Sequence, residues 1–166
     1  MFKIFRIEGV SDQKNFKQPL RIVLDPRLST PSFAKVLSKS DKALLVTTNQ
    51  DPDIVDELAK AGAEILYQPG QQDSIDLHGL MAYLADREIN EVLLETGATL
   101  SGSMLQAGLV DELIVYMAPH LMGNKARGLF NLSGIDTMGD RISLEITDIR
   151  AFGSDWRITA KIAQTQ

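Results

Sequence analysis

The chain has 166 residues, of which 44% are hydrophobic, and its 17 Lys and Arg against 22 Asp and Glu give a formal net charge of −5. A chain of this length can bury a core without a disulfide or a structural metal, and the lack of cysteine excludes disulfide scaffolds, iron–sulfur clusters and cysteine-ligated zinc. The two histidines exclude a multi-histidine metal site, and the acidic balance argues against nucleic-acid binding.

The N-terminal residues show no targeting signal. Residues 1–6 lack the long apolar run and cleavage site of a signal peptide, and no stretch approaches the roughly 18 consecutive apolar residues of a membrane span. We therefore expect a cytoplasmic protein without membrane contact. Residues 1–17, with a candidate strand at 1–7, fit the later pattern least well, and residues 18–166 are expected to form a single domain.

From about Leu20, short apolar runs alternate with helical patterns, which is typical of βαβ units and a largely parallel sheet. Each apolar run is rich in Leu or β-branched residues and ends at polar or turn residues. Four strands are predicted in this way, at residues 20–25, 43–48, 63–67 and 91–95.

Two helices with one apolar face are predicted between these strands. The first is capped by Asp53 and ends at Gly62, the residue type that usually follows a helix. The second is capped by Asp76 and repeats apolar residues at helical spacing from Leu77 to Leu84.

The pattern changes after residue 95. A turn and a short helix that stops at Gly108 lead to a fifth predicted strand at residues 112–118. Residues 142–149 and 156–162 then alternate apolar and polar residues, as antiparallel strands with one solvated face do. The sequence thus predicts an α/β fold with a mostly parallel central sheet, flanking helices and C-terminal antiparallel strands.

Ligands of an open α/β sheet gather at the carboxyl ends of the strands. The stretches that follow predicted strands are residues 25–30, 47–50, 68–70 and 95–102. In the last stretch, a helix that starts at Thr99 or Ser101 would point free backbone N–H groups at a phosphate.

This turn matches neither standard phosphate fingerprint. Position 99 is Thr where the Rossmann pattern needs its second Gly, and position 103 is Ser where the P-loop needs Lys. Gly97 in a tight turn and Gly102 in close helix packing therefore remain open as purely structural residues. Glu95 is either a solvated strand end or a hydrogen-bond acceptor for a sugar hydroxyl or amine.

Other polar residues are weaker candidates. His78 and His120 are expected to be solvated, and Asp111 and Glu112 to be exposed charges at a strand start. Arg27 could meet a phosphate at the end of the first strand of the parallel series, although a surface role is the better interpretation.

Three motifs in order resemble the reductase domain of the bifunctional riboflavin-biosynthesis deaminase/reductase, which has a dihydrofolate-reductase-like fold. They are Glu-x-Gly at Glu95–Gly97, Leu-Val-Asp-Glu-Leu at Leu109–Leu113 and Pro-x-x-x-Gly at Pro119–Gly123. Residues 18–25 with Pro31 also look like an earlier strand of that domain, so the resemblance extends from about Gln18 to the C-terminus.

The resemblance implies an NADPH-dependent reduction of 5-amino-6-(5-phosphoribosylamino)uracil, in which hydride reaches C1′ of the ring-opened ribose. It implies that Glu95 contacts the substrate and that Pro26, which has no N–H to donate, falls at a cofactor-contacting position. Arg27 and Lys35 are candidate partners for the 2′-phosphate. The implied cofactor-contacting turn consists of Gly97, Ala98, Thr99, Leu100, Ser101, Gly102 and Ser103. No catalytic residue and no metal ligand is assigned.

The chain also departs from the family. Members carry a further strand and helix before the strand resembling residues 20–25, and nothing in residues 1–17 matches them. The zinc deaminase domain needs cysteine ligands, so we expect it in a longer or separate chain.

Two alternatives to an active reductase stay open, a catalytically incomplete nucleotide-binding fragment and a dimerisation module. Family reductases associate through their sheets, so a homodimer is expected, with residues 113–117 near the interface.

Overall fold

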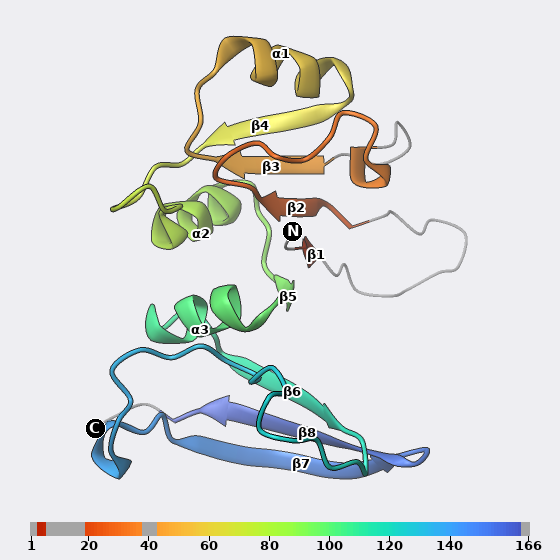
Figure 1. The fold of residues 1–166 in the computed structure, drawn as a ribbon, viewed down its shortest axis with the longest axis vertical. Coiled ribbons are helices and arrows are strands. Elements are labelled where there is room, and N and C mark those ends of the chain that lie inside the picture. The colour runs from red at the N-terminus through yellow and green to blue at the C-terminus, as the bar shows by residue number, and fades with distance from the viewer. Residues whose placement is uncertain (1–2, 6–18, 38–42, 164–166) are drawn as a thin grey trace. The chain divides into compact units, whose positions relative to one another are not determined.

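The computed structural model describes residues 3–5, 19–37 and 43–163 and divides into two compact units, residues 1–100 and 101–166 (Figure 1). The strands of the first unit are β1 (Lys3–Phe5), β2 (Arg21–Leu24), β3 (Ala43–Thr47), β4 (Ala63–Tyr67) and β5 (Leu93–Glu95). Those of the second unit are β6 (Glu112–Met117), β7 (Leu144–Phe152) and β8 (Asp155–Ile162). The single domain expected over residues 18–166 stays a prediction.

The first unit is built on a five-stranded sheet in the order β4-β3-β2-β1-β5, with a parallel part of three strands. The strands β2, β3 and β4 are parallel, whereas β1 is antiparallel to both of its neighbours, β2 and β5. Since β2 and β5 are both antiparallel to β1, they run in the same direction as each other. The carboxyl ends of β2, β3, β4 and β5 therefore lie at one edge of the sheet. The candidate strand within residues 1–7 is therefore confirmed, as the antiparallel member of the sheet.

Two helices accompany this sheet, and the cap predicted for the first is wrong. Helix α1 (Pro52–Lys60) is capped by Asp51, whose Oδ1 accepts hydrogen bonds from the backbone N–H groups of Asp53 at 3.0 Å and Ile54 at 3.5 Å. Proline suits the first helical position because its fixed φ is helical and its missing N–H would have no partner there. Pro52 therefore starts the helix, and Asp53 lies inside the first turn. The predicted stop at Gly62 is confirmed by its φ of 103°.

Helix α2 (Leu77–Asp86) begins as predicted, with the Asp76 carboxylate accepting from the N–H of Gly79 at 3.0 Å. Leu80 and Leu84 lie on its buried face. At Gly79 the side-chain amide of Gln68, just beyond β4, occupies the space that a Cβ would take, so Gln68 would have to move for a larger residue to fit there.

The core of the first unit joins the sheet, α1 and the 3-10 helix η1 (Lys35–Leu37). Strand β3 is buried along its whole length, as a parallel strand covered on both faces should be. One cluster of buried side chains consists of Val23, Leu28, Val36, Leu37, Ala43, Leu45 and Leu58.

The second unit is a three-stranded antiparallel sheet in the order β6-β8-β7. Helix α3 (Ala98–Gln106) precedes it, and Gly108 follows that helix with a φ of 68°, as predicted for its end. The hairpin turn of β7 and β8 lies at Gly153, where φ is 64°. The 3-10 helix η2 (Met138–Asp140) precedes β7. The antiparallel C-terminal strands are thereby confirmed.

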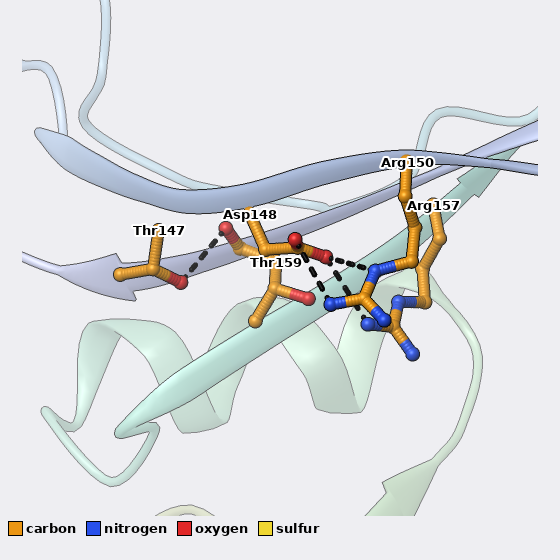
Figure 2. Close-up of polar contacts among 5 residues, drawn as sticks. All are labelled: Thr147, Asp148, Arg150, Arg157 and Thr159. Carbon is orange, nitrogen blue, oxygen red and sulfur yellow. Dashed lines mark hydrogen bonds and ion pairs between the residues drawn. The ribbon is translucent and has the colours of Figure 1, made fainter.

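Polar contacts join the two strands of the hairpin, as Figure 2 shows. Arg150 and Arg157 are direct cross-strand partners, and like charges in that position repel each other. Asp148 compensates them, because it accepts two hydrogen bonds from Arg150, at 2.7 and 3.0 Å, and one from Arg157 at 3.1 Å. These bonds hold the pKa of Asp148 below its usual value.

Candidate functional site

Glu95 and the loop after β2 lie at the same edge of the first sheet. Leu94 and Ile22 both pair with Ile4, so β5 and β2 flank β1 in register. At about 4.8 Å between neighbouring strands, their backbones are about 10 Å apart. Glu95 is solvent-exposed at the end of β5, which leaves its carboxylate available to a ligand.

A pocket of about 300 Å³ lies at the carboxyl end of β2. It contains the predicted cofactor position Pro26 and the phosphate candidate Arg27, and it reaches back to β2 itself. A volume of this size is at the lower end for small-molecule sites, so the pocket suits one part of a dinucleotide. Its lining residues are Val23, Leu24, Asp25, Pro26, Arg27, Ser29, Thr30 and Pro31.

Asp25 closes the loop that forms this pocket. Its buried carboxylate accepts hydrogen bonds from the hydroxyl of Ser29 at 3.0 Å and from both the backbone N–H and the hydroxyl of Thr30 at 2.7 Å. Burial by itself raises the pKa of Asp25, but the hydrogen bonds from Thr30 and Ser29 outweigh it and bring the pKa below its usual value. Asp25 is therefore an ionised anchor of the loop.

Pro26 has no backbone N–H, but its carbonyl oxygen points toward the end of β3. The carbonyl accepts hydrogen bonds from the hydroxyls of Thr47 at 3.0 Å and Thr48 at 3.1 Å. The sequence singled out residues 47–50 as a strand end, but the pairing of these two threonines with Pro26 was missed, since residues 21 positions apart carry no local signal.

Helix α3 begins at Ala98, one residue before the earlier of the two predicted starts. Its first backbone N–H groups have no partner within the helix, as at any helix N-terminus. Within the predicted cofactor-contacting turn, Gly97, Thr99 and Ser103 are exposed, whereas Leu100 and Gly102 are buried. Thr99 and Ser103 are four residues apart and therefore lie on the same face of the helix.

Gly102 has a clear packing role. A Cβ at this position would collide with the carbonyl oxygen of Asn131, in the loop between β6 and β7. The structural interpretation of Gly102 as a site of close packing is thus supported, with a loop in place of a strand as its neighbour. Its role in cofactor binding stays a prediction.

The remaining candidates lie in solvent. His78, His120, Asp111 and Glu112 are all exposed, as expected from the sequence. Within residues 3–5, 19–37 and 43–163, no three metal-ligating side chains come together, and no helix is long and apolar enough to cross a membrane.

Comparisons with known sequences point to one group of proteins. The family model described as RibD C-terminal domain matches residues 6–158. The riboflavin biosynthesis protein RibD of Escherichia coli is 36% identical over 148 residues, which are 89% of this chain and 39% of that protein. The chain therefore spans about two fifths of the length of that relative.

Two shorter relatives carry the names of reductases. The 2,5-diamino-6-ribosylamino-4(3H)-pyrimidinone 5′-phosphate reductase of Methanothermobacter thermautotrophicus is 37% identical, over 82% of this chain and 63% of that protein. The 5-amino-6-(5-phosphoribosylamino)uracil reductase of Buchnera aphidicola is 28% identical, over 90% of this chain and 70% of that protein.

A solved structure has the same fold. The structure of Acinetobacter baumannii RibD, form 1, superposes with a TM-score of 0.74 at 29% sequence identity, and the match covers 93% of this chain and 40% of that one. The predicted α/β fold, dihydrofolate-reductase-like with C-terminal antiparallel strands, is confirmed.

Proposed function

This chain belongs to the RibD C-terminal domain family, and we propose that it binds NADPH and reduces 5-amino-6-(5-phosphoribosylamino)uracil to the ribityl form in riboflavin biosynthesis. The observation that carries the proposal is that β2 and β5 end at the same edge of the sheet. The pocket lies at the end of β2, and Glu95 lies at the end of β5. The deaminase domain would belong to a longer or separate chain. A phosphorylated intermediate and a charged cofactor cross membranes poorly, so the cytoplasm is the expected compartment.

The residues at this edge fit a dinucleotide. At the start of α3, Gly97 and Ala98 are small, so a phosphate can approach the N-terminal end of the helix closely. In the pocket, the cationic Arg27 is exposed and suits the 2′-phosphate that distinguishes NADPH from NADH. Lys35, exposed in η1, is a second candidate for that phosphate. Bound NADPH would supply the hydride.

Glu95 is the proposed substrate contact. Its carboxylate accepts hydrogen bonds only, so it would bind a ribose hydroxyl or an amine of the pyrimidine. Such a bond to a charged acceptor is stronger than a neutral one and fixes the ring-opened sugar in one orientation. The two reductase relatives are named for pyrimidines that differ around the ring, so both pyrimidines are candidate substrates of this chain.

An apolar face on the sheet of the second unit supports a homodimer. Strand register places eleven apolar side chains on one face of its sheet, opposite the face that carries the Arg150 and Arg157 contacts of Figure 2. Ile146 and Ile149 are 57% and 54% exposed there, and apolar faces of this kind mark interaction sites. The face consists of Leu113, Val115, Met117, Leu144, Ile146, Ile149, Ala151, Trp156, Ile158, Ala160 and Ile162. Ala160 is already buried within one copy, so we propose that two copies cover the exposed side chains of this face for each other, namely Met117, Leu144, Ile146, Ile149 and Trp156.

The test is a calorimetric titration of this chain with NADPH, and with NADH as the control, followed by turnover of both pyrimidine substrates. Saturable binding that prefers NADPH, with turnover of the uracil, is the expected result. Binding without turnover would support the catalytically incomplete fragment. No binding to a folded dimer would leave the dimerisation module as the function.

A further inference from the structure

We propose that Thr48, together with Thr47 and Asn49, positions the pocket loop, residues 26–30, so that Arg27 can meet a cofactor phosphate. The inference rests on the proposed function. Strand β3, which ends at Thr47, is the parallel neighbour of β2, so residues that follow the two strands lie side by side at the carboxyl edge. The sheet itself thus brings these polar side chains to the loop.

The first contact fixes the carbonyl of Pro26. This oxygen accepts from the hydroxyl of Thr47 at 3.0 Å, the hydroxyl of Thr48 at 3.1 Å and the backbone N–H of Thr48 at 3.3 Å. A carbonyl oxygen has two lone pairs, so three donors use its full capacity. Thr47 is completely buried, which keeps water from competing for its bond.

The second contact fixes the backbone of Arg27. The side-chain amide of Asn49 donates to the Arg27 carbonyl at 3.2 Å. Arg27 also lines the pocket, and its exposed side chain makes no hydrogen bond or ion pair with the described residues. The backbone of this residue is therefore held while its charged end is left available for a ligand.

The next residue shows that the loop is held against strain. Leu28 has a φ of 52°, in the left-handed region that side chains other than glycine seldom adopt, and its side chain is buried in the core cluster. Such a conformation persists only where the surroundings determine it from several sides. Here Asp25 holds Ser29 and Thr30 on one side of Leu28, and the end of β3 holds Pro26 and Arg27 on the other.

The test compares two substitutions at Thr48 in the full chain. Thr48→Val keeps the shape but removes the hydroxyl, whereas Thr48→Ser keeps the hydroxyl. Loss of one hydrogen bond at the pocket is expected to weaken NADPH binding about fivefold in Thr48→Val. Thr48→Ser is expected to stay within about twofold of the unchanged chain, because the donor is retained. A drop of equal size in both variants would overturn the role of the hydroxyl.

A matched control separates positioning from general stability. Thr147→Val removes a comparable hydroxyl bond, from Thr147 to the Thr159 carbonyl at 3.2 Å, in the other unit. It is expected to lower the melting temperature without weakening NADPH binding. Asn49→Ala is the second variant at the loop and should weaken NADPH binding two- to fivefold, roughly one neutral hydrogen bond. A loss of NADPH affinity in Thr147→Val as large as in Thr48→Val would contradict positioning.

A double-mutant cycle shows whether Thr48 acts through Arg27. In an Arg27→Ala background, Thr48→Val should have almost no further effect on NADPH affinity, because the group it positions is gone. Additive losses would overturn the coupling to Arg27. Normal NADPH binding by Thr48→Val, beside normal binding by the unchanged chain, would overturn the positioning role alone. Failure of the unchanged, folded chain to bind NADPH would overturn the proposed function and this inference together.

Discussion

The α-carbon of Gly102 in α3 lies directly against the carbonyl oxygen of Asn131, 29 residues further along the chain, and no side chain fits between them. A glycine that looks like part of a phosphate-binding turn thus holds the long loop between β6 and β7 against the helix. Gln106, one turn further on in α3, holds the same loop by donating to the carbonyl of Ser133 at 2.7 Å.

Gly102→Ala should therefore destabilise the protein by about 1–3 kcal/mol, as forced overpacking does. The added methyl group must push away a backbone carbonyl, which cannot rotate aside as a side chain could. The measurement is chemical unfolding of the two proteins. Gly123→Ala is the control, because a Cβ at Gly123 meets open space, and it should leave the unfolding free energy nearly unchanged. Equal stability of Gly102→Ala and the unchanged chain would contradict the packing role.

Acid should weaken the fold through Asp25. Its pKa in the folded chain lies below the ordinary value of 3.8, so the unfolded chain binds protons at a pH where the folded chain does not. The stabilisation is therefore complete above pH 3.8 and is lost as pH falls through the lower folded value. Urea unfolding at several pH values between neutrality and strong acid would measure this loss.

Asp25→Asn identifies the source of that pH dependence. The variant should be less stable than the unchanged chain by about 2 kcal/mol at neutral pH, because charged hydrogen bonds become neutral ones. The difference should shrink as pH falls below 3.8, when Asp25 itself becomes protonated. A difference that stays constant down to strong acid would show that the ionised form of Asp25 is not what stabilises the loop.

Glu95→Gln should weaken substrate binding about 10- to 100-fold while changing NADPH affinity much less. The physical reason is the loss of a charged acceptor at the end of β5, which we assign to the substrate. Substrate KM and calorimetric NADPH affinity measure the two effects separately. Glu91→Gln, an equally exposed acid just before the same strand, should change neither. Equal loss of substrate and cofactor would indicate a structural acid.

Gly97→Val should weaken NADPH binding about tenfold and leave the fold intact. A branched side chain before the first turn of α3 would keep a phosphate from the N-terminal end of the helix, where the helix dipole favours an anion. The readouts are calorimetric affinity and the melting temperature. Ala107→Val places similar bulk just beyond the other end of α3 and serves as the control. Unchanged NADPH affinity in Gly97→Val would remove the turn from the cofactor site.

Local patterns determined the elements of this protein. The strand at residues 63–67, the Asp76 cap and the helix ends at Gly62 and Gly108 follow from residue types whose backbone preferences act over a few positions. The error at Asp53 is also local, since Pro52 at the first helical position marks Asp51 as the cap. The edge of the sheet at which we propose the site could likewise be expected from the sequence, because parallel strands end together.

Only the tertiary structure decided how that edge is held together. The antiparallel insertion of β1 and the hydroxyls of Thr47 and Thr48 on Pro26 join residues far apart in the chain. Hydrogen bonds and close contacts between distant residues leave no periodicity in the sequence. The types and order of the elements could therefore be predicted from neighbouring residues, whereas the shape of the pocket required the folded chain.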